Sequence, residues 1–286
     1  MSSADILNSL QIVKLMNNLP ILLGAIAGDT IGSIYEFDPV KNYDFTLLDE
    51  QMEYTDDSIL TLAVAEWLMD DPTHSPIILQ ERLRYWGNKY RNPKGSYGNR
   101  FYKWLLDSNP QPYQSWGNGS AMRVSAVGFA CETLDEVLNV AKLSAEITHN
   151  HPEGIKGAQA VAAAIFMAQN GKTKEEIRQY ISNTFHYDLN FTCKDIHEDY
   201  GFEDSYQKTV PQSIVAFLDS KNFEDAIRLT ISLGGDADTM GAITGSIALA
   251  YYHEMPKEIR DFVMAKLPGD LMEVLKRFDN FISDKK

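Results

Sequence analysis

The chain is organised around the stretch Ser232-Leu233-Gly234-Gly235-Asp236-Ala237-Asp238-Thr239, which runs directly into the apolar segment Met240-Gly241-Ala242-Ile243. The glycines allow a tight turn, and the two carboxylates and the hydroxyl that follow supply oxygen ligands for a hard cation. Short polar residues at this position are also typical of a helix N-cap, where they accept hydrogen bonds from free backbone N–H groups. The turn alone therefore fits both a helix cap and a cation site.

A second acidic cluster of the same design, Tyr54-Thr55-Asp56-Asp57-Ser58, precedes the apolar segment 59–68. If both clusters face one pocket, their aspartates repel one another, and cations are needed to keep them ionised. The clusters offer oxygen ligands and contain no His or Cys, which favours Mg²⁺, Mn²⁺ or Ca²⁺ over zinc or copper. The two clusters together predict a site for one or two divalent cations.

Length and composition bound the class of protein. The 286 residues contain no Pro-, Gly- or Ser-rich linker, so we expect a single domain over residues 1–286. Hydrophobic residues make up 44% of the chain, enough to bury a sizeable core. The net charge of −14 argues against a nucleic-acid partner, which usually requires a basic surface. A nucleotide-sized ligand stays open, because backbone N–H groups and metal ions can hold one without excess Lys or Arg.

The two cysteines, Cys131 and Cys193, are too few for a disulfide framework and fit a reducing compartment. The most apolar early stretch, residues 19–27, is followed closely by Asp29 and Glu36. No signal peptide or membrane-spanning helix is predicted. We therefore expect a cytoplasmic protein without a membrane partner, and a monomer.

Residues 4–18 and a second run from residue 20 show apolar residues at helical spacing. In the second run a glycine recurs at every fourth position, from Gly24 through Gly32. On a helix these glycines share one face, which suits either close helix packing or the approach of a ligand. Asp29 and Glu36 would also share a face if that helix continued, so Glu36 becomes a candidate active-site residue.

Nearly every other periodic segment is also helical, so the predicted fold class is all-α, a compact orthogonal bundle of short helices. Residues 38–53 show no regular spacing of apolar residues, so we expect a loop or a short hairpin there. Thr133 with Glu136, and Thr173 with Glu176, have the spacing of capping boxes. The remaining expectations are helix starts at Pro152, Pro211, Pro256 and Pro268, a helix cap at Asn222, and an irregular surface excursion over residues 186–206.

A glycine-rich turn, Ser115-Trp116-Gly117-Asn118-Gly119, opens a further helix. An ordinary tight turn is one account of it. The other is a phosphate site formed by free backbone N–H groups, with Trp116 packed on a base or ribose. His149 also allows two interpretations, a contact to a ligand phosphate or a buried histidine between helices. A zinc site formed by His149 and His151 lacks further nitrogen or sulfur ligands, and we disfavour it.

Taken together, the motifs resemble those of the ADP-ribosylglycohydrolase family, whose members include the bacterial dinitrogenase-reductase-activating glycohydrolase. The resemblance extends from about Leu23 to Tyr252, and the order of its motifs makes it specific. The segments that carry it are Gly24-Ala25-Ile26-Ala27-Gly28-Asp29-Thr30-Ile31-Gly32, Tyr54-Thr55-Asp56-Asp57, Gly117-Asn118-Gly119-Ser120-Ala121-Met122-Arg123, Thr148-His149 and Gly234-Gly235-Asp236-Ala237-Asp238-Thr239.

The resemblance implies an all-α bundle with a two-metal centre, Mg²⁺ or Mn²⁺, at the bottom of a cleft. Asp238 would bridge the two ions. Glu36 and Asp57 would be the catalytic residues, although the segment around Glu36 varies more in the family. The metal ligands would be Thr55, Asp56, Asp57, Asp236, Asp238 and Thr239, and the substrate-binding residues Tyr97, Gly98, Ser115, Trp116, Gly117, Asn118, Gly119, Met122 and His149.

The resemblance also implies the chemistry, which is hydrolysis of the bond between ADP-ribose and its acceptor. The substrate would be an ADP-ribosylated protein or a small ADP-ribose conjugate. The metal ions would hold the ribose and activate water, while Glu36 or a metal-site aspartate assists proton transfer. Arginine is the expected acceptor, and serine, O-acetyl and nucleic-acid base linkages stay open. A non-catalytic ADP-ribose binder also stays open, as does a dinuclear phosphohydrolase, which the absence of a His-Asp pair weakens.

Overall fold

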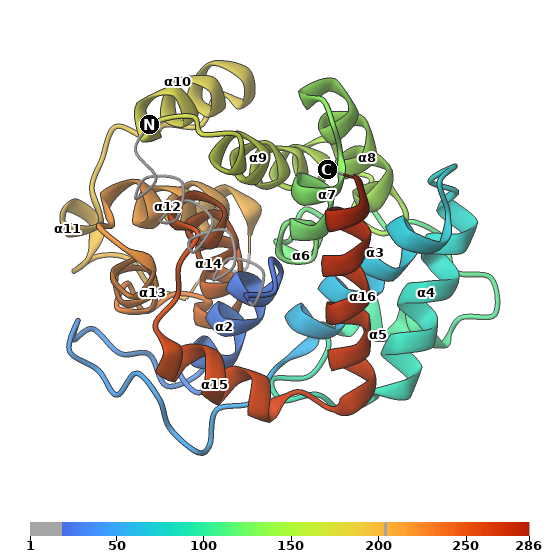
Figure 1. Ribbon diagram of the computed structural model, residues 1–286, viewed down its shortest axis with the longest axis horizontal. Coiled ribbons are helices and arrows are strands. Elements are labelled where there is room, and N and C mark those ends of the chain that lie inside the picture. The colour runs from blue at the N-terminus through green and yellow to red at the C-terminus, as the bar shows by residue number, and fades with distance from the viewer. Residues whose placement is uncertain (1–18, 203–204, 286) are drawn as a thin grey trace, which may run out of the picture.

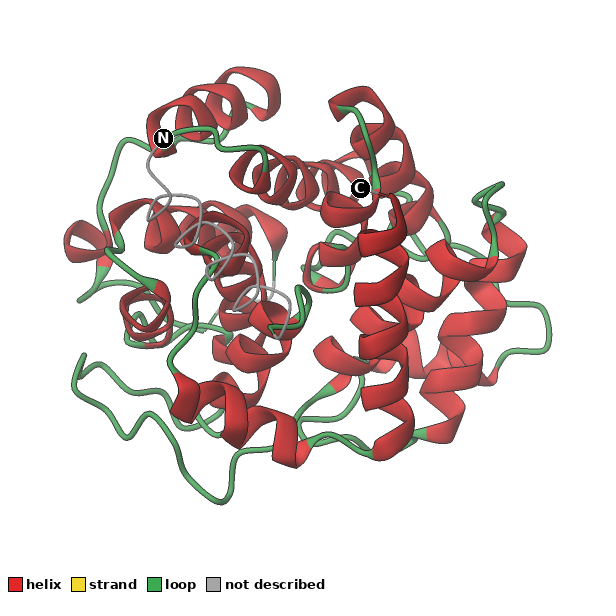
Figure 2. Cartoon of the chain, in the orientation of Figure 1, coloured by secondary structure: helices red, strands yellow, loops and turns green. Residues whose placement is uncertain are grey.

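The computed structural model of the protein describes residues 19–202 and 205–285. Within these residues it contains fifteen helices and no β-strand (Figure 2), which confirms the all-α prediction. The helical spacing noted at residues 4–18 lies outside the described residues. The helices are α2 (Leu23–Gly32), α3 (Asp56–Asp70), α4 (Pro76–Lys89), α5 (Asn99–Leu106), α6 (Gly119–Met122), α7 (Ser125–Ala130), α8 (Leu134–Glu146), α9 (Pro152–Gln169), α10 (Lys174–Phe185), α11 (Cys193–Ile196), α12 (Tyr206–Asp219), α13 (Phe223–Ile231), α14 (Ala237–Tyr252), α15 (Lys257–Lys266) and α16 (Gly269–Lys285).

The centre of the fold is the packed pair of helices α2 and α14 (Figure 1). Every residue of α2 is buried, and its glycines lie against α14. A Cβ added to Gly28 would come within 1.8 Å of the carbonyl oxygen of Gly241, and one added to Gly32 within 2.3 Å of that of Ala237. The glycine spacing therefore serves close helix packing, and this packing places the end of α2 beside the start of α14.

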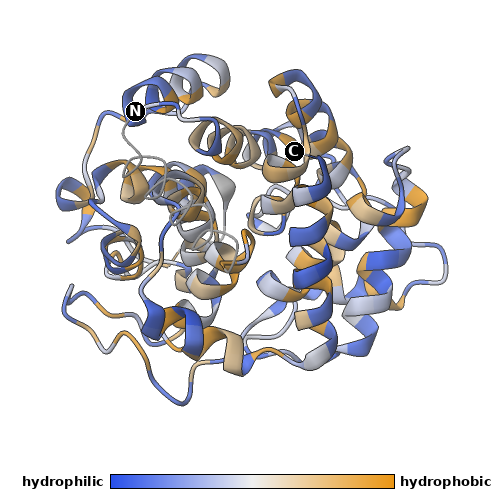
Figure 3. Ribbon diagram, in the orientation of Figure 1, coloured by the Kyte–Doolittle hydropathy of each residue, from blue (hydrophilic) through white to orange (hydrophobic). Residues whose placement is uncertain are grey.

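The other helices enclose this pair. Helix α14 also contacts α9, α12 and α13, while α2 contacts α3 and α15 (Figure 1). The outer helices α10 and α16 show both hydrophilic and hydrophobic residues, whereas α9 is mostly hydrophobic or neutral (Figure 3). This is the pattern expected when amphipathic helices cover helices that are buried on all sides.

Several helix starts follow the sequence pattern. The Thr173 side chain accepts from Glu176 N–H and the Glu176 carboxylate accepts from Thr173 N–H, so this capping box is complete. Pro152 occupies the first turn of α9, and the Asn222 side chain caps α13. The capping box predicted at Thr133 is wrong in one half. Thr133 accepts from Glu136 N–H, but the Glu136 carboxylate accepts from Glu132 N–H, one residue before the cap.

Two further predictions need correction. Pro211 lies inside α12, which begins five residues earlier, at Tyr206. Pro211 is tolerated there because the carbonyl that its missing N–H would have bonded belongs to the exposed residue Gln207, where water can reach it. The segment 186–206 is more than a surface excursion. It contains α11 and buries Leu189 and Cys193 completely or almost completely.

The segment 38–53 is a loop without a strand, so the loop rather than the hairpin is confirmed. It is fixed by Lys41, whose Nζ donates hydrogen bonds to three backbone carbonyls, those of His197 at 2.6 Å, Tyr200 at 2.5 Å and Leu233 at 2.6 Å. Lys41 therefore ties this loop both to the segment 186–206 and to the turn before α14. In the part of the chain that the structure describes, no helix combines the length and hydropathy needed to cross a membrane.

Candidate active site and metal centre

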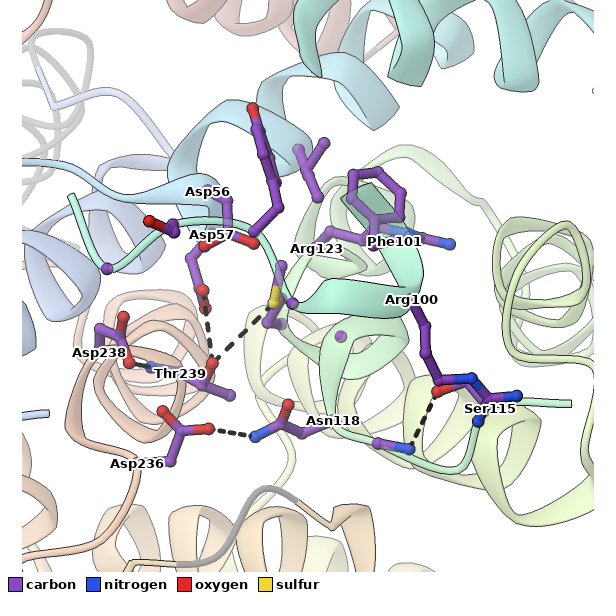
Figure 4. A pocket seen from close by; sticks show the side chains of 18 of the residues that line it. Asp56, Asp57, Arg100, Phe101, Ser115, Asn118, Arg123, Asp236, Asp238 and Thr239 are labelled. Carbon is purple, nitrogen blue, oxygen red and sulfur yellow. Dashed lines mark hydrogen bonds between the residues drawn. The ribbon is translucent and has the colours of Figure 1, made fainter. Parts of the chain in front are cut away.

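The starts of α3 and α14 face one cleft of about 540 Å³. The start of α6 and the loop before α5 complete its walls. Figure 4 shows Asp57, Asp236 and Asp238 on one side of the cleft, and Arg100, Phe101 and Ser115 on the other. The two acidic clusters of the sequence are therefore brought together because α2 packs on α14 and Asp29 of α2 binds the start of α3.

Most residues predicted for the site line this cleft. The exceptions are Thr55, which is fully buried behind it, and Trp116, which is 56% exposed and packs near the ring of His151 at 5.6 Å between centroids. The predicted residues that do line the cleft are Glu36, Asp56, Asp57, Tyr97, Gly98, Ser115, Gly117, Asn118, Gly119, Met122, His149, Asp236, Asp238 and Thr239.

The carboxylates form two groups whose oxygen atoms lie within 4.8 Å of one another. One group is Asp29, Asp57 and Asp238, and the other is Glu36, Asp236 and Asp238. Asp238 belongs to both groups. Burial and mutual repulsion raise the pKa values of Asp57 and Asp238 well above the usual range. This arrangement is costly without a compensating positive charge.

These residues fit a centre for divalent cations. The donor set consists of oxygen atoms, which suits Mg²⁺ or Mn²⁺. Asp57 Oδ1 and Glu36 Oε2 are buried and have no hydrogen-bond partner. A buried polar atom that points into a cleft without a partner is explained if a ligand completes its interactions. Asp57, Asp236 and Asp238 would hold the ions, with Glu36 and Asp56 at the edge of the cluster.

Asp29 is a site residue that the sequence pattern did not assign to the metal centre. The helix does not continue to Glu36, because α2 ends at Gly32, so the condition for a face shared by Asp29 and Glu36 is not met. Asp29 instead accepts hydrogen bonds from Thr55 N–H at 2.9 Å and Ser58 N–H at 3.1 Å, and from both side-chain hydroxyls. Burial raises its pKa to about 6, although these bonds oppose the increase. Asp29 therefore holds the start of α3 in place from behind the cluster.

Glu36 reaches the cluster from the loop after α2. A Cβ added to Gly95 would lie 2.8 Å from Glu36 Oε2 and 4.0 Å from Asp238 Oδ2, so only a glycine leaves room for this carboxylate. Gly95 also has a φ of +76°, which glycine adopts without strain. Burial and the negative charges of Asp238 and Asp29 raise the pKa of Glu36 to about 8. In the metal-free protein Glu36 therefore carries a proton at neutral pH.

The glycine-rich turn supports the cluster as well as lining the cleft. Asn118 Nδ2 donates to Asp236 Oδ2 at 2.7 Å, which fixes that carboxylate (Figure 4). Ser115 Oγ accepts from Gly117 N–H at 3.3 Å, and a Cβ on Gly119 would lie 3.2 Å from the imidazole of His149. The turn therefore has a role in the protein that does not depend on a ligand.

His149 is buried at the cleft wall. Its Nδ1 lies 2.8 Å from Thr148 Oγ1, which in turn accepts from a guanidinium nitrogen of Arg123 at 2.9 Å. Burial and the nearby charges of Arg123 and Arg100 lower the pKa of His149 well below 6.5, so it is neutral at physiological pH. His151 does not share a metal with it, because His151 Nδ1 accepts from Glu153 N–H and caps α9.

Comparison with known proteins gives one consistent result. A model of the family described as ADP-ribosylglycohydrolase matches residues 19–282. The protein named ADP-ribosylhydrolase ARH3 from Gallus gallus is 25% identical over 312 aligned residues, which cover 82% of this chain and 84% of the relative. The ADP-ribosylarginine hydrolase Tri1 of Pseudomonas putida is 27% identical over 267 aligned residues, which cover 81% of this chain and 69% of the relative. A solved structure titled ADP-ribosylglycohydrolase-related protein complex has the same fold, with a TM-score of 0.67, 23% identity, and coverage of 93% of this chain and 95% of that one.

Proposed function

Because the chain belongs to the ADP-ribosylglycohydrolase family, we propose that it is a hydrolase that removes ADP-ribose from a modified protein, with arginine as the acceptor, and that it requires two divalent cations, Mg²⁺ or Mn²⁺. The observation that carries the proposal is the convergence of Asp57, Asp236 and Asp238 in one cleft with two partnerless carboxylate oxygens. The relatives named for ADP-ribosyl hydrolysis support the substrate class.

The ions, when bound, would supply positive charge that orients the ribose hydroxyls and activates water. The protein residues hold them in place, since Asp29 fixes the start of α3 and Asn118 fixes Asp236. Glu36 lies at the edge of the cluster, where its carboxyl group lines the cleft and can exchange a proton with a bound ligand. We assign Glu36 the proton transfer to or from the departing acceptor. Asp57 is the second catalytic residue of the proposal and acts as a metal ligand.

The experiment measures free ADP-ribose released from arginine-, serine- and acetyl-linked conjugates, with Mg²⁺, with Mn²⁺ and with a chelator. We expect release to stop on chelation and to return with either metal. Asp57→Ala and Asp238→Ala should each lower the rate at least about 100-fold, because each removes a ligand from the centre. Asp261→Ala, at a surface aspartate on α15, is the matched control and should retain full activity.

Binding of Mn²⁺ measured by calorimetry provides a readout that does not require turnover. Both active-site variants should bind the metal more weakly than the wild type does. Full activity in the presence of chelator, or in Asp238→Ala, would exclude the metal-dependent mechanism. Tight binding of ADP-ribose with no release from any conjugate would instead support a non-catalytic binding protein.

A further inference from the structure

The cleft has two ends of opposite charge. At one end lie the carboxylates of Asp57, Asp236 and Asp238, and at the other the guanidinium groups of Arg100 and Arg123 (Figure 4). Arg123 is 1% exposed and its Nη2 donates to Ser144 O and Thr148 Oγ1, so Arg123 contributes charge from behind the cleft wall. Because an anionic diphosphate suits the end beside Arg100, we place the reacting bond and the departing acceptor beside the carboxylate cluster.

Two exposed phenylalanines, Phe37 and Phe202, line the cleft at this acidic end. Phe37 directly follows Glu36 in the chain. Phe202 lies two residues after Tyr200, whose ring atom Cε1 is 2.5 Å from the position that a Cβ on Gly235 would take. Both phenylalanines therefore belong to segments that contact the carboxylate cluster.

The two rings stack on one another although they come from different loops. Their centroids are 6.2 Å apart and their planes differ by 30°. Phe37 is 71% exposed and Phe202 54% exposed. Burying an exposed aromatic ring against a ligand is favourable, so two exposed rings at the cleft can contribute to binding.

The pair is held in position before any substrate arrives. Lys41 lies on the loop that follows Phe37, and its Nζ donates to the carbonyls of His197 and Tyr200 in the segment that leads to Phe202. It also donates to Leu233 O, before the acidic turn. Lys41 therefore links the loop after Phe37, the segment before Phe202 and the turn before the acidic cluster.

We propose that Phe37 and Phe202 form the acceptor subsite and select a planar cationic acceptor, the guanidinium group of ADP-ribosylated arginine. This inference rests on the proposed function. The negative faces of aromatic rings attract a guanidinium group, which stacks on them. A planar group between two rings needs about 7 Å, twice the contact distance of about 3.5 Å, so the guanidinium packs on the cleft surface of the pair rather than between the rings.

Acceptors without a planar cationic group should bind less strongly to the surface formed by Phe37 and Phe202. Serine and O-acetyl linkages present neither a planar group nor a positive charge, so the rings give them only a small apolar contact. A nucleic-acid base is planar, but the phosphates of its chain meet a protein with a net charge of −14.

The experiment compares two peptides of identical sequence that carry ADP-ribose on arginine or on serine, with kcat and KM measured for each. The variants are Phe37→Ala, Phe202→Ala, their combination, Phe37→Trp and Phe37→Leu. Tyr85→Ala, at an aromatic residue on α4 that is 52% exposed, is the control and should match the wild type.

We expect each alanine variant to lower kcat/KM for the arginine conjugate about 3- to 30-fold, mainly through KM, and to leave the serine conjugate nearly unchanged. Phe37→Trp should retain the preference, whereas Phe37→Leu, which is apolar but has no aromatic face, should lose it. Binding of free ADP-ribose should not change, since it lacks the acceptor.

An active double variant that keeps the wild-type preference for arginine would overturn the subsite. A wild-type enzyme that prefers the serine conjugate would overturn both the subsite and the arginine acceptor, and would leave the hydrolase activity itself supported. If the wild type releases ADP-ribose from neither peptide, the proposed function fails instead, and the two failures are thereby distinguished.

Discussion

The starts of α3 and α14 have the same sequence design, but they are built differently. At α3, Thr55 is the N-cap and accepts from Asp57 N–H at 3.2 Å, while Asp29 accepts from Thr55 N–H and Ser58 N–H. At α14, the N-cap Asp236 makes no side-chain cap hydrogen bond. Side chains thus accept from three N–H groups at the start of α3, whereas at the start of α14 the N-cap side chain accepts from none and Asp238 Oδ1 accepts from Thr239 N–H.

The difference shows how a carboxylate at a helix start can remain free of hydrogen bonds to the backbone of its own helix. Asp29 comes from α2 and satisfies the backbone of α3, so Asp57 needs no capping role and its Oδ1 stays without a hydrogen-bond partner. At α14, Asp236 is held by Asn118 instead of by its own helix. In both cases a side chain from another element fixes the helix start, and at α3 this leaves a carboxylate oxygen of Asp57 for a ligand.

The largest effect should follow from separating the two helix starts. In Gly28→Ala the new Cβ would collide with the carbonyl of Gly241 at 1.8 Å, and backbone cannot move aside as a flexible side chain can. We expect a loss of more than about 4 kcal/mol in the free energy of unfolding, measured with urea, together with loss of Mn²⁺ binding.

Gly269→Ala is the matched control for this change, because nothing lies within 4 Å of a Cβ at that position. Its stability should stay within about 0.5 kcal/mol of the wild type. If Gly28→Ala proved as stable as this control, α2 and α14 would not be in the close contact described above.

A smaller effect should distinguish the start of α3 from the start of α14. Asp29→Ala leaves the buried N–H groups of Thr55 and Ser58 without an acceptor, so we expect a loss of about 2–3 kcal/mol in chelator. Asp236→Ala loses no cap bond, and the relief of repulsion in the cluster offsets the loss of the hydrogen bond from Asn118 Nδ2. Its stability in chelator should change by less than about 1 kcal/mol.

Urea unfolding of both variants in chelator, with hydrogen exchange at the first turn of α3, makes this comparison. Faster exchange at that turn is expected in Asp29→Ala alone. Equal losses of stability in the two variants would mean that the two helix starts do not differ in the way the hydrogen bonds indicate.

The smallest effect on stability is expected at Asp279 of α16. Its Oδ1 accepts from the N–H of Ile21, just before α2, at 2.9 Å. Burial raises the pKa of Asp279 from 3.8 to about 6. Its contribution to stability is therefore fully present below about pH 4 and is lost as the pH rises through about 6. Asp279→Asn keeps an acceptor oxygen but carries no charge, so at pH 7 it should be about 1–2 kcal/mol more stable than the wild type.

The measurement is urea unfolding of Asp279→Asn and the wild type between pH 4 and pH 8. Their difference in stability should be smallest at pH 4 and grow through pH 6. A difference that is the same at every pH would show that the charge of Asp279 is not the cause.

Much of the helical structure could be predicted from local patterns. The capping box at Thr173, the start of α9 at Pro152 and the glycine spacing of α2 all depend on residues within one or two turns of each other. The box at Thr133 failed in one half because Glu136 has a second N–H within reach, that of Glu132. Local spacing does not distinguish between two such donors.

In the candidate site, too, some features could be predicted from the local sequence and others could not. The sequence by itself determined the chemistry available, which is two acidic turns before apolar helices, a glycine-rich turn and oxygen ligands without nitrogen or sulfur. Only the tertiary structure decided how these residues are used. Asp29 supports α3 rather than sharing a helix face with Glu36, and Phe37 meets Phe202, because contacts between distant segments depend on which surfaces helix packing brings together.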